Sequence, residues 1–514
     1  MPIAEAPPPA HPSVIHLLAE AIERAPQAPA MVDGTRRLDY AGVGRCVGAG
    51  VSWLRSQRVR PGDRVALIAE NSIDCALAFH VLHAARAQAV PINPAYTARE
   101  LGEILADAAP SLVLFDAVRR TELAPVLGRL GLKGQGIGVG ALELDQWQTR
   151  ADASLPDDLP APDDLATLQY TGGTTGRPKG VNITHGQMAV NIAQREAALP
   201  TQAGDVVLCV MPLFHVFATS MCLHLAANCR GLLVILPRYR PDDVLDVIAD
   251  HRVTCLPAGP TIIAGLMACE RFAQADLASL RAVYSGSAAL PEAVLARWER
   301  AVGCPIFEGY GQSEAGPVLT YQFVGEPRIP GTVGRALPGT RVEIVDADSG
   351  TRVLPPGHDG EVRARGPQIM SGYRDRPAET AAALRDGWLY TGDIGRLDQQ
   401  GILTISDRKK DMVITGGYNV YPREVEEVLH AHPAVAEAAA VGRPDDYRGE
   451  VIVAYVALRT GADADVDGLL GHCRENLARY KVPAEIIFLP RLPRTTVGKL
   501  DKPALRTISK QGSA

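Results

Sequence analysis

The chain has 514 residues, of which 46% are hydrophobic and 21% charged, and its 52 basic and 58 acidic side chains give a formal net charge of −6. This composition is typical of a globular protein and excludes disordered, collagen-like and coiled-coil chains. The length predicts more than one packed domain. A mildly acidic chain has no general attraction for nucleic acid or anionic membranes, so we expect no nucleic-acid partner and a local site for any bound anion.

The cysteines and the N-terminus indicate a cytoplasmic protein. The nine cysteines are odd in number and form no CxxC pair, which favours reduced, buried thiols. Residues 1–9 lack the basic and apolar regions of a secretory signal. No apolar run approaches the roughly 18 residues that suggest a membrane-spanning helix. We therefore expect no transmembrane segment, and we leave open peripheral membrane contact and a homodimer.

In the first part of the chain, from about residue 13 to residue 330, helical patterns alternate with short β-rich runs. Helical spacing occurs at 14–24 and 38–57. Buried strands are predicted at 64–69, 89–91, 111–115, 206–212, 232–236, 254–257 and 282–284. Strands separated by helices predict parallel sheets that are covered on both faces.

Near Gly331 the pattern changes to short strands separated by turn sequences such as Pro355-Pro356-Gly357. These strands are predicted at 341–345, 361–365, 394–397 and 402–406, and they suggest a small, mostly antiparallel barrel.

After a charged cluster at 407–411 the pattern becomes α+β, with a helix predicted to begin at Pro422. A strand at 451–458, a helix at 466–480 and a strand at 485–489 follow. The predicted fold class is α/β. A large N-terminal domain, residues 1–408, holds two parallel-type α/β sheet subdomains and the barrel, and residues 409–514 form a smaller α+β C-terminal domain.

The strongest local signal is residues 170–180, with the sequence Tyr-Thr-Gly-Gly-Thr-Thr-Gly-Arg-Pro-Lys-Gly. It is followed by Thr184 and Gln187, which predict a capping box at the start of a helix. Glycines let backbone N–H groups approach an anion, and hydroxyl and basic side chains add donors and charge. It is not a Walker A loop, because Arg177 stands where that motif has glycine. The predicted phosphate-binding residues are Thr171, Gly172, Gly173, Thr174, Thr175, Gly176 and Lys179. A flexible Gly/Thr turn is the alternative.

This loop resembles the phosphate loop of the adenylate-forming superfamily, which includes acyl-CoA synthetases, luciferases and peptide-synthetase adenylation domains. Further motifs resembling that superfamily follow in the same order as far as residue 502. The resemblance implies an enzyme that converts a carboxylic acid and MgATP to acyl-AMP and pyrophosphate, and then transfers the acyl group to CoA with release of AMP. Because one anion attacks another, such a site must act mainly by positioning and by cationic stabilisation.

The nucleotide residues follow from this resemblance. The run Glu308, Gly309, Tyr310, Gly311, Gln312, Ser313 and Glu314 resembles the family's Tyr-Gly-x-Thr-Glu motif, with serine in place of threonine. It implies Glu314 as the Mg²⁺ ligand, Ser313 as a donor to phosphate and Tyr310 as the residue that stacks on adenine.

Two further segments complete the implied nucleotide site. Gly286, Ser287 and Ala288 lie in a segment that resembles the family's adenine-contact turn. Asp393 matches the aspartate that binds both ribose hydroxyls, which suits the two acceptor oxygens of a carboxylate, and Arg408 matches a second residue near the ribose. Taken alone, each of these residues is equally explained as a turn or surface residue.

The remaining implied residues concern the reaction cycle. Lys499 matches the mobile catalytic lysine that reaches the attacking carboxylate and the α-phosphate. Lys410 matches the hinge of a mobile C-terminal domain, and Gly416, Gly417 and Tyr418 resemble the segment that lines the pantetheine tunnel.

His215 lies in a segment that resembles the family's aromatic gate, and a buried core histidine is its alternative. His80 and His83 lie three apart on an apolar helix face and lack a further ligand residue, so we expect them to be structural.

The acid substrate is the least determined part of the prediction. No acidic residue follows Phe214 in the gate segment, so an unpaired substrate ammonium would be buried at high cost, and an α-amino acid is disfavoured. The expected pocket walls, 216–225 and 256–267, are mainly apolar. Such walls suit an acyl chain or an aryl ring. The segments 169–176 and 308–311 resemble those of medium- to long-chain fatty acyl-CoA synthetases, and this resemblance implies such an enzyme. An aryl- or dicarboxylate-CoA ligase, an acyl-AMP ligase that loads a carrier protein, and an inactive binding paralogue stay open as alternatives.

Overall fold

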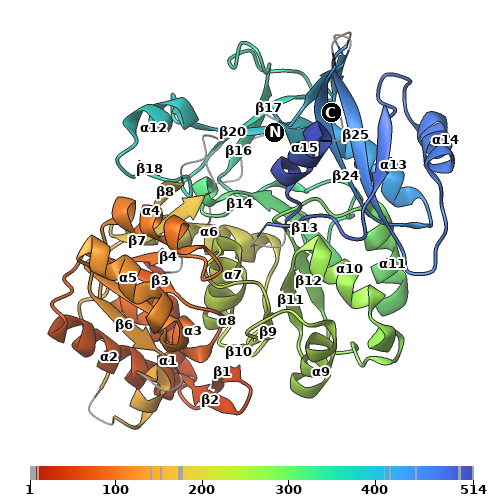
Figure 1. Ribbon diagram of the computed structural model, residues 1–514. Helices are drawn as coiled ribbons and strands as arrows, with labels where there is room; N and C mark the ends of the chain where they lie inside the picture. The colour runs from red at the N-terminus through yellow and green to blue at the C-terminus, as the bar shows by residue number, and fades with distance from the viewer. Residues whose placement is uncertain are drawn as a thin grey trace.

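The chain folds into four β-sheets and their covering helices, seen in the computed structural model of Figure 1. The structure describes residues 7, 11–138, 142–150, 153–171, 178–409, 411–415, 418–445, 448–495 and 499–511, without the side chains of residues 408, 418, 419 and 509–511. The elements coloured red to yellow and those coloured green form neighbouring halves of the lower part of Figure 1, and the blue C-terminal elements lie above them.

One sheet carries the strands on both sides of the predicted phosphate loop. Its order is β18 (Gly372–Tyr373), β8 (Lys179–Thr184), β7 (Leu165–Thr171), β4 (Gln88–Pro91), β3 (Arg64–Ile68), β5 (Leu112–Asp116) and β6 (Gly134–Ile137). In β3, Val65 and Leu67 face one hydrophobic core while Ala66 and Ile68 face another, so both faces of this sheet are buried. This explains why β3 and β5 are nearly continuous apolar runs.

A second, nine-stranded sheet carries the adenine-turn and Tyr-Gly motifs. Its order is β15 (Arg335–Ala336), β14 (Val318–Tyr321), β13 (Ile306–Gly311), β12 (Ala282–Ser285), β11 (Cys255–Ala258), β9 (Val206–Cys209), β10 (Leu232–Ile235), β1 (Pro29–Asp33) and β2 (Arg36–Asp39). The strands from β1 to β13 along this order are parallel, whereas β2, β14 and β15 pair antiparallel.

The main core joins these two sheets. The helices of the large N-terminal part are α1 (Val14–Arg24), α2 (Tyr40–Ser56), α3 (Ile73–Ala84), α4 (Ala98–Ala108), α5 (Arg120–Leu130), α6 (His185–Ala198), α7 (Val216–Ala218), α8 (Leu225–Asn228), α9 (Pro241–His251), α10 (Pro260–Ala268), α11 (Glu292–Val302) and α12 (Pro377–Ala383). Every residue of α3 is buried, as expected for a helix that is apolar on all sides. A π-helical segment, η3 (Thr219–His224), joins α7 to α8 directly after the gate segment.

Two smaller sheets complete the molecule. The first is antiparallel and contains β16 (Arg341–Val345), β17 (Gly360–Arg365), β20 (Trp388–Leu397), β19 (Leu384–Arg385) and β21 (Leu403–Arg408). The second contains β23 (Tyr418–Val420), β22 (Val413–Thr415), β25 (Gly449–Leu458), β24 (Val435–Asp445) and β26 (Glu485–Phe488). Helices α13 (Pro422–Ala431), α14 (Val466–Asn476) and α15 (Lys502–Gln511) belong to this C-terminal part, whose two cores contain only residues from Val413 onward.

The predicted fold class is confirmed, and several predicted boundaries are wrong. The run 38–57 is not one helix: β2 ends at Asp39, whose side chain accepts a hydrogen bond from the Gly42 N–H at 2.6 Å and so caps α2. The phosphate-loop strands β7 and β8 are antiparallel, so that sheet is mixed. The predicted helix 466–480 ends at Asn476.

The cysteines are free thiols, and all except the partly exposed Cys269 are buried. Within the described part of the chain, no helix combines the length and the apolar character that a membrane span needs.

Candidate active site

The two described ends of the phosphate loop lie side by side. Thr171 ends β7 and is paired with Lys179 at the start of β8. Thr184 and Gln187 form the predicted capping box of α6, with both reciprocal hydrogen bonds present. Gly172, Gly173, Thr174, Thr175 and Gly176 lie outside the described residues. The loop therefore begins and ends on two neighbouring antiparallel strands, β7 and β8. This pairing fixes the backbone position of Lys179.

Glu314 lies in the short 3₁₀ turn η5 (Ser313–Ala315), and Tyr373 of β18 contacts its side chain. The Tyr373 hydroxyl donates to Oε1 of Glu314 at 2.8 Å, and the Met370 N–H donates to the Glu314 carbonyl at 2.9 Å. The Lys179 ammonium lies 5.4 Å from the centre of the Tyr373 ring. One tyrosine thus links the proposed metal ligand to the phosphate-loop lysine.

The adenine turn and the Tyr-Gly motif follow neighbouring parallel strands. Ser285 of β12 pairs with Glu308 of β13, so the segments that follow these residues leave the same edge of the sheet. Ser287 has a φ of 69°, a left-handed conformation that a non-glycine residue adopts only under local constraint. Such constrained residues are concentrated at functional sites.

Glycine is required at two positions near this edge because neighbouring side chains approach the backbone closely. A Cβ on Gly286 would lie 2.9 Å from the Phe217 ring, and one on Gly309 would lie 2.5 Å from the Tyr321 ring. Gly311 and Ala288 are exposed and Gly309 is half-buried. A flat ligand can therefore approach the backbone at this edge.

Glu308, at the start of the Tyr-Gly motif, is buried. Its side chain accepts a hydrogen bond from the Leu290 N–H at 3.2 Å. Burial raises the pKa of Glu308 to about 7, and the nearby positive charge of Arg423 opposes this rise. At neutral pH this carboxyl is therefore partly protonated.

Tyr310, Asp393 and Arg408 form the ribose side of the candidate site. The Tyr310 hydroxyl donates to Oδ2 of Asp393 at 2.5 Å. Asp393 of β20 is paired with Arg408 of β21, although the Arg408 side chain is among those that the structure leaves undescribed. The two predicted nucleotide residues Tyr310 and Asp393, which come from different sheets, are thus in direct contact.

His215 and Lys499 lie close together although they come from opposite ends of the chain. Burial and, to a smaller extent, the positive charge of Lys499 together lower the pKa of His215 to about 3. Nδ1 of His215 accepts the Phe217 N–H at 3.2 Å, which places His215 as the cap of α7. His215 is therefore a neutral imidazole beside a cation.

The predicted hinge lies between two anchored residues. The Lys409 ammonium donates to Glu361 of β17 at 3.0 Å and to the carbonyl of Ala347, just after β16, at 2.7 Å. Both strands belong to the smaller antiparallel sheet. On the other side, Asp411 pairs with Arg506 of α15 at 2.6 Å. Lys410, Gly416 and Gly417 lie outside the described residues, and only the backbone of Tyr418 is described.

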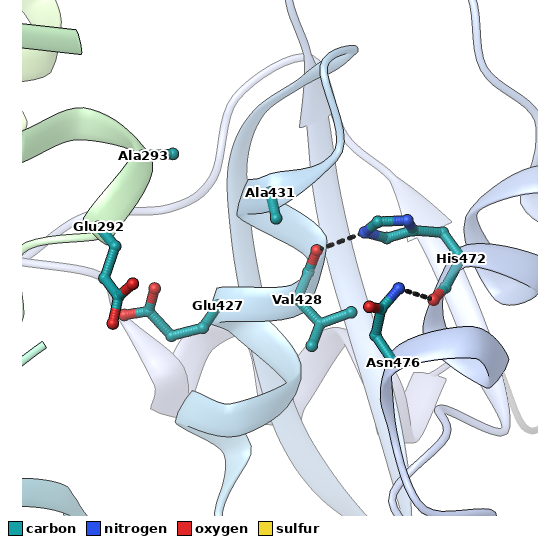
Figure 2. A pocket seen from close by; sticks show the side chains of 7 residues that line it. All are labelled: Glu292, Ala293, Glu427, Val428, Ala431, His472 and Asn476. Atoms are coloured by element: carbon teal, nitrogen blue, oxygen red, sulfur yellow. Dashed lines mark hydrogen bonds between the residues drawn. The ribbon is translucent and has the colours of Figure 1, made fainter. Parts of the chain in front are cut away.

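A pocket of about 240 Å³ lies between α11 of the N-terminal part and α13 and α14 of the C-terminal part. Figure 2 shows the carboxylates of Glu292 and Glu427 facing each other across this boundary. Burial raises the pKa of Glu427, the charge of Arg423 opposes the rise, and the like charge of Glu292 adds to it. Ionisation of Glu427 is therefore disfavoured in this arrangement of the two parts.

The site has the groups that MgATP requires. Glu314 offers a partly exposed carboxylate whose direction is fixed by Tyr373, and oxygen ligands of this kind suit Mg²⁺. Lys179 and Thr171 hold the ends of a phosphate loop, and Asp393 offers a carboxylate for a diol. The residues present therefore fit both the metal and the nucleotide.

Sequence reasoning missed Tyr373 and Phe217 as contributors to the site. Tyr373 lies 59 positions from Glu314 in the chain, so its role depends on a long-range contact. The only local signal was Gly372 before it and Pro377 after it, which suggest a turn. Phe217 was visible as the aromatic residue two positions after His215.

Known protein families match both the N-terminal and the C-terminal part of the chain. The AMP-binding enzyme family matches residues 18–374, and the AMP-binding enzyme C-terminal domain matches residues 424–499. The chain is 36% identical over 484 residues to a long-chain-fatty-acid–CoA ligase of Bacillus subtilis, covering 87% of this chain and 86% of the relative. It is also 36% identical over 490 residues to a feruloyl-CoA synthase of an Amycolatopsis species, covering 94% and 96%.

A solved structure agrees with these relatives. The ATP-bound MatB of Rhodopseudomonas palustris superposes with a TM-score of 0.89 at 32% identity, over 96% of this chain and 99% of that protein. The chain belongs to the AMP-binding enzyme family, within the adenylate-forming superfamily. It is an AMP-forming acyl-CoA synthetase that uses ATP, Mg²⁺ and CoA, which confirms the resemblance, the enzyme class and the cofactors predicted from the sequence.

Proposed function

We propose that this chain activates medium- to long-chain fatty acids as their CoA thioesters. The observation that supports the reaction is the electrostatic influence of Lys499, from the C-terminal part, on His215 of the predicted gate segment. For the acid, the support is the apolar character of the helices after the gate. Buried apolar side chains there include Val216, Phe217, Met221, Ile262, Ile263, Leu266 and Met267. Such walls suit an acyl chain.

In the first half-reaction, the acid carboxylate attacks the α-phosphorus of ATP and pyrophosphate leaves. The loop between Thr171 and Lys179 would hold the phosphates, and Ser313 would donate to them. Bound Mg²⁺ would neutralise phosphate charge. Glu314 would hold that ion, while Lys499 would stabilise the charge on the attacking carboxylate and the α-phosphate.

The nucleoside would occupy the space beside Tyr310 and Asp393. Gly286, Ser287 and Ala288 would offer backbone groups to the adenine edge, with the Tyr310 ring against its face. Asp393 would accept both ribose hydroxyls, with Arg408 nearby. His215 stays neutral at the gate, so it adds no positive charge near the acid.

For the second half-reaction, residues 409–514 would rotate as a mobile C-terminal domain against residues 1–408. The hinge at Lys410 is supported by its two neighbours: Lys409 binds Glu361 of the N-terminal part, and Asp411 binds Arg506 of the C-terminal part. After rotation, Gly416, Gly417 and Tyr418 would line the path of the CoA thiol. The CoA sulfur then attacks the acyl carbonyl and AMP leaves.

A substrate panel tests this proposal. Purified protein is given ATP, Mg²⁺ and CoA with acids from C2 to C18, aryl acids and dicarboxylic acids, and AMP and acyl-CoA are measured. We expect the highest kcat/KM for acids of medium to long chain length. Acid-dependent release of pyrophosphate without CoA-dependent release of AMP would favour a carrier-protein acceptor, and no turnover with any acid would favour a binding paralogue.

An aryl-CoA ligase is the second candidate. The Phe217 ring lies against Gly286 at the junction of gate and adenine turn, where an aromatic wall could stack on a flat acid. A relative at 36% identity is a feruloyl-CoA synthase. Higher kcat/KM for cinnamic-type acids than for any fatty acid in the same panel would replace the first proposal with this one.

A further inference from the structure

We propose that Tyr373 is a positioning residue that orients the Glu314 carboxylate toward the metal and couples it to the phosphate-loop lysine. The inference rests on the proposed use of MgATP at this site. Tyr373 does not belong to the phosphate loop or to the Tyr-Gly motif, and it reaches both from β18. Its hydroxyl and its ring make two separate contacts, which can be tested separately.

The hydroxyl contact fixes the carboxylate. Tyr373 Oη donates to Oε1 of Glu314 at 2.8 Å, an ordinary length for a hydrogen bond between two oxygens. With this oxygen of Glu314 held by the Tyr373 hydroxyl, the direction of the other oxygen is fixed, and a cation could bind there.

The ring contact positions the lysine. The Lys179 ammonium lies 5.4 Å from the ring centre, within the range of a cation–π interaction. The backbone supports this approach, because Tyr373 is paired with Val181 of β8 and the Arg374 N–H donates to the Gly180 carbonyl at 2.8 Å. The strand that carries Lys179 is thus bonded to the strand that carries Tyr373.

The segment around Tyr373 is itself held in place. The Tyr373 N–H donates to Oγ1 of Thr380 at 3.0 Å, and Gly372 has a φ of 136°, where a side chain would be strained. Asp107 at the end of α4 accepts hydrogen bonds from Tyr170 and Arg376, both at 2.6 Å. This network joins β7, β8, β18 and α4, so Tyr373 has a defined position before any ligand binds.

Tyr373→Phe separates the two contacts, because it keeps the ring over Lys179 and removes the hydroxyl from Glu314. The first half-reaction is measured by ATP–pyrophosphate exchange over a range of Mg²⁺ concentrations. Loss of a hydrogen bond to a charged group predicts a half-saturating Mg²⁺ concentration about tenfold or more higher, with kcat at saturating Mg²⁺ within about threefold of the wild type. Thioester formation from supplied acyl-AMP and CoA should be unchanged.

A binding readout accompanies the kinetics. The thermal midpoint is measured with ATP in EDTA and with ATP plus Mg²⁺. We expect Tyr373→Phe to keep the shift produced by ATP alone and to lose most of the added shift produced by Mg²⁺. Tyr373→Leu, which also removes the ring, should in addition reduce the shift with ATP alone, because Lys179 loses its support.

Tyr40→Phe is the matched control. The Tyr40 hydroxyl is buried in α2 and donates to the Gly231 carbonyl at 2.7 Å, far along the chain from the candidate site. It should lower the thermal midpoint without changing the Mg²⁺ dependence. The inference is overturned if Tyr373→Phe shows wild-type Mg²⁺ dependence, or if it weakens ATP binding equally with and without the metal. If ATP and Mg²⁺ do not raise the thermal midpoint of the wild-type protein, that result would instead contradict the proposed function on which the inference rests.

Discussion

Lys499 carries its charge on a flexible side chain of the C-terminal part, at a position where it lowers the pKa of the half-buried His215. A lysine carried by a mobile C-terminal domain would be withdrawn from the site when its own domain moves. A lysine on the N-terminal sheets would stay in place. The Lys499 N–H donates to Oγ1 of Thr495 at 3.2 Å, which helps to fix the backbone that presents the ammonium. Under the proposed rotation, the cation would therefore act in the first half-reaction only.

Lys499→Ala should therefore reduce ATP–pyrophosphate exchange about 100-fold or more, because it removes a charge placed for the transition state. Thioester formation from supplied acyl-AMP and CoA should stay within about threefold of the wild type. Lys481→Ala, which removes a lysine that pairs with Glu424 at 2.6 Å in the same domain, is the control. Equal loss of both half-reactions in Lys499→Ala would contradict the proposed domain rotation.

At the scale of elements, the rotation would be absorbed between β21 and β22. Lys410→Pro fixes φ and removes an N–H at the proposed hinge, so it should slow the second half-reaction about tenfold or more and leave the first nearly unchanged. Rapid-quench measurement of each half-reaction checks this. Lys410→Ala, which removes only the charge, should behave like the wild type, and an equal effect of proline on both steps would place the hinge elsewhere.

Two helices that meet across the predicted domain boundary would make the proposed rotation pH-sensitive. Glu427 of α13 faces Glu292 of α11 (Figure 2), with Arg423 and Glu426 as its charged neighbours on α13. Because the pKa of Glu427 is raised here, the arrangement is most stable while this carboxyl is protonated, and it loses stability as pH rises through that pKa. Ionisation thus favours departure from the present arrangement.

Glu427→Gln removes this repulsion and should slow the second half-reaction about two- to tenfold at pH 8, with a smaller effect at pH 5.5. Glu424→Gln is the matched control, since Glu424 lies on the same helix and pairs with Lys481. A second half-reaction in Glu427→Gln that is as fast as in the wild type at pH 8 would show that the pair does not affect the rotation.

Local patterns were enough to predict many of the strands and several of the helices. Helix α1 has the predicted bounds, and α13 begins at Pro422, because spacing and capping are encoded within a few residues. The helix predicted over 38–57 failed because Leu38 belongs to a strand that is defined by pairing with β1, a partner that periodicity cannot detect.

In the candidate site, too, features encoded by local sequence were predictable and those that depend on long-range contacts were not. The motifs predicted Glu314, Asp393 and Lys499 as site residues, which are far apart in the sequence. Tyr373 and the contact between Tyr310 and Asp393 could not be predicted, because each depends on how two sheets are placed relative to each other. Residues 172–176 were strongly indicated by the sequence and lie outside the described chain.

At the scale of the whole molecule, four histidines lie buried together where α3 meets α6 and the π-helical segment. His83 packs against His185 with ring centres 5.1 Å apart and against His224 at 5.8 Å, and His80 lies 6.3 Å from His224. Burial lowers the pKa of His80 to about 3 and that of His83 to about 4, and it lowers the pKa of His185 and His224 as well.

These histidines predict loss of stability in acid. Below the unfolded-state pKa of about 6.5 the unfolded chain binds protons that the folded chain does not, so stability should fall by up to about 1.4 kcal/mol per pH unit for each histidine. The loss should begin near pH 6.5 and continue toward pH 4, with little change above pH 7. Urea midpoints between pH 8 and pH 4.5 check this, and a midpoint that does not change between pH 7 and pH 5 would contradict it.

The distribution of thiols has a practical consequence for watching the two half-reactions. Cys269 alone is partly exposed, at the end of α10, while the other thiols are buried in folded protein. A maleimide dye would therefore react first at one place on the N-terminal part. A second cysteine introduced on an exposed face of the C-terminal part would then allow energy transfer between two dyes to report each swing of a single molecule in real time.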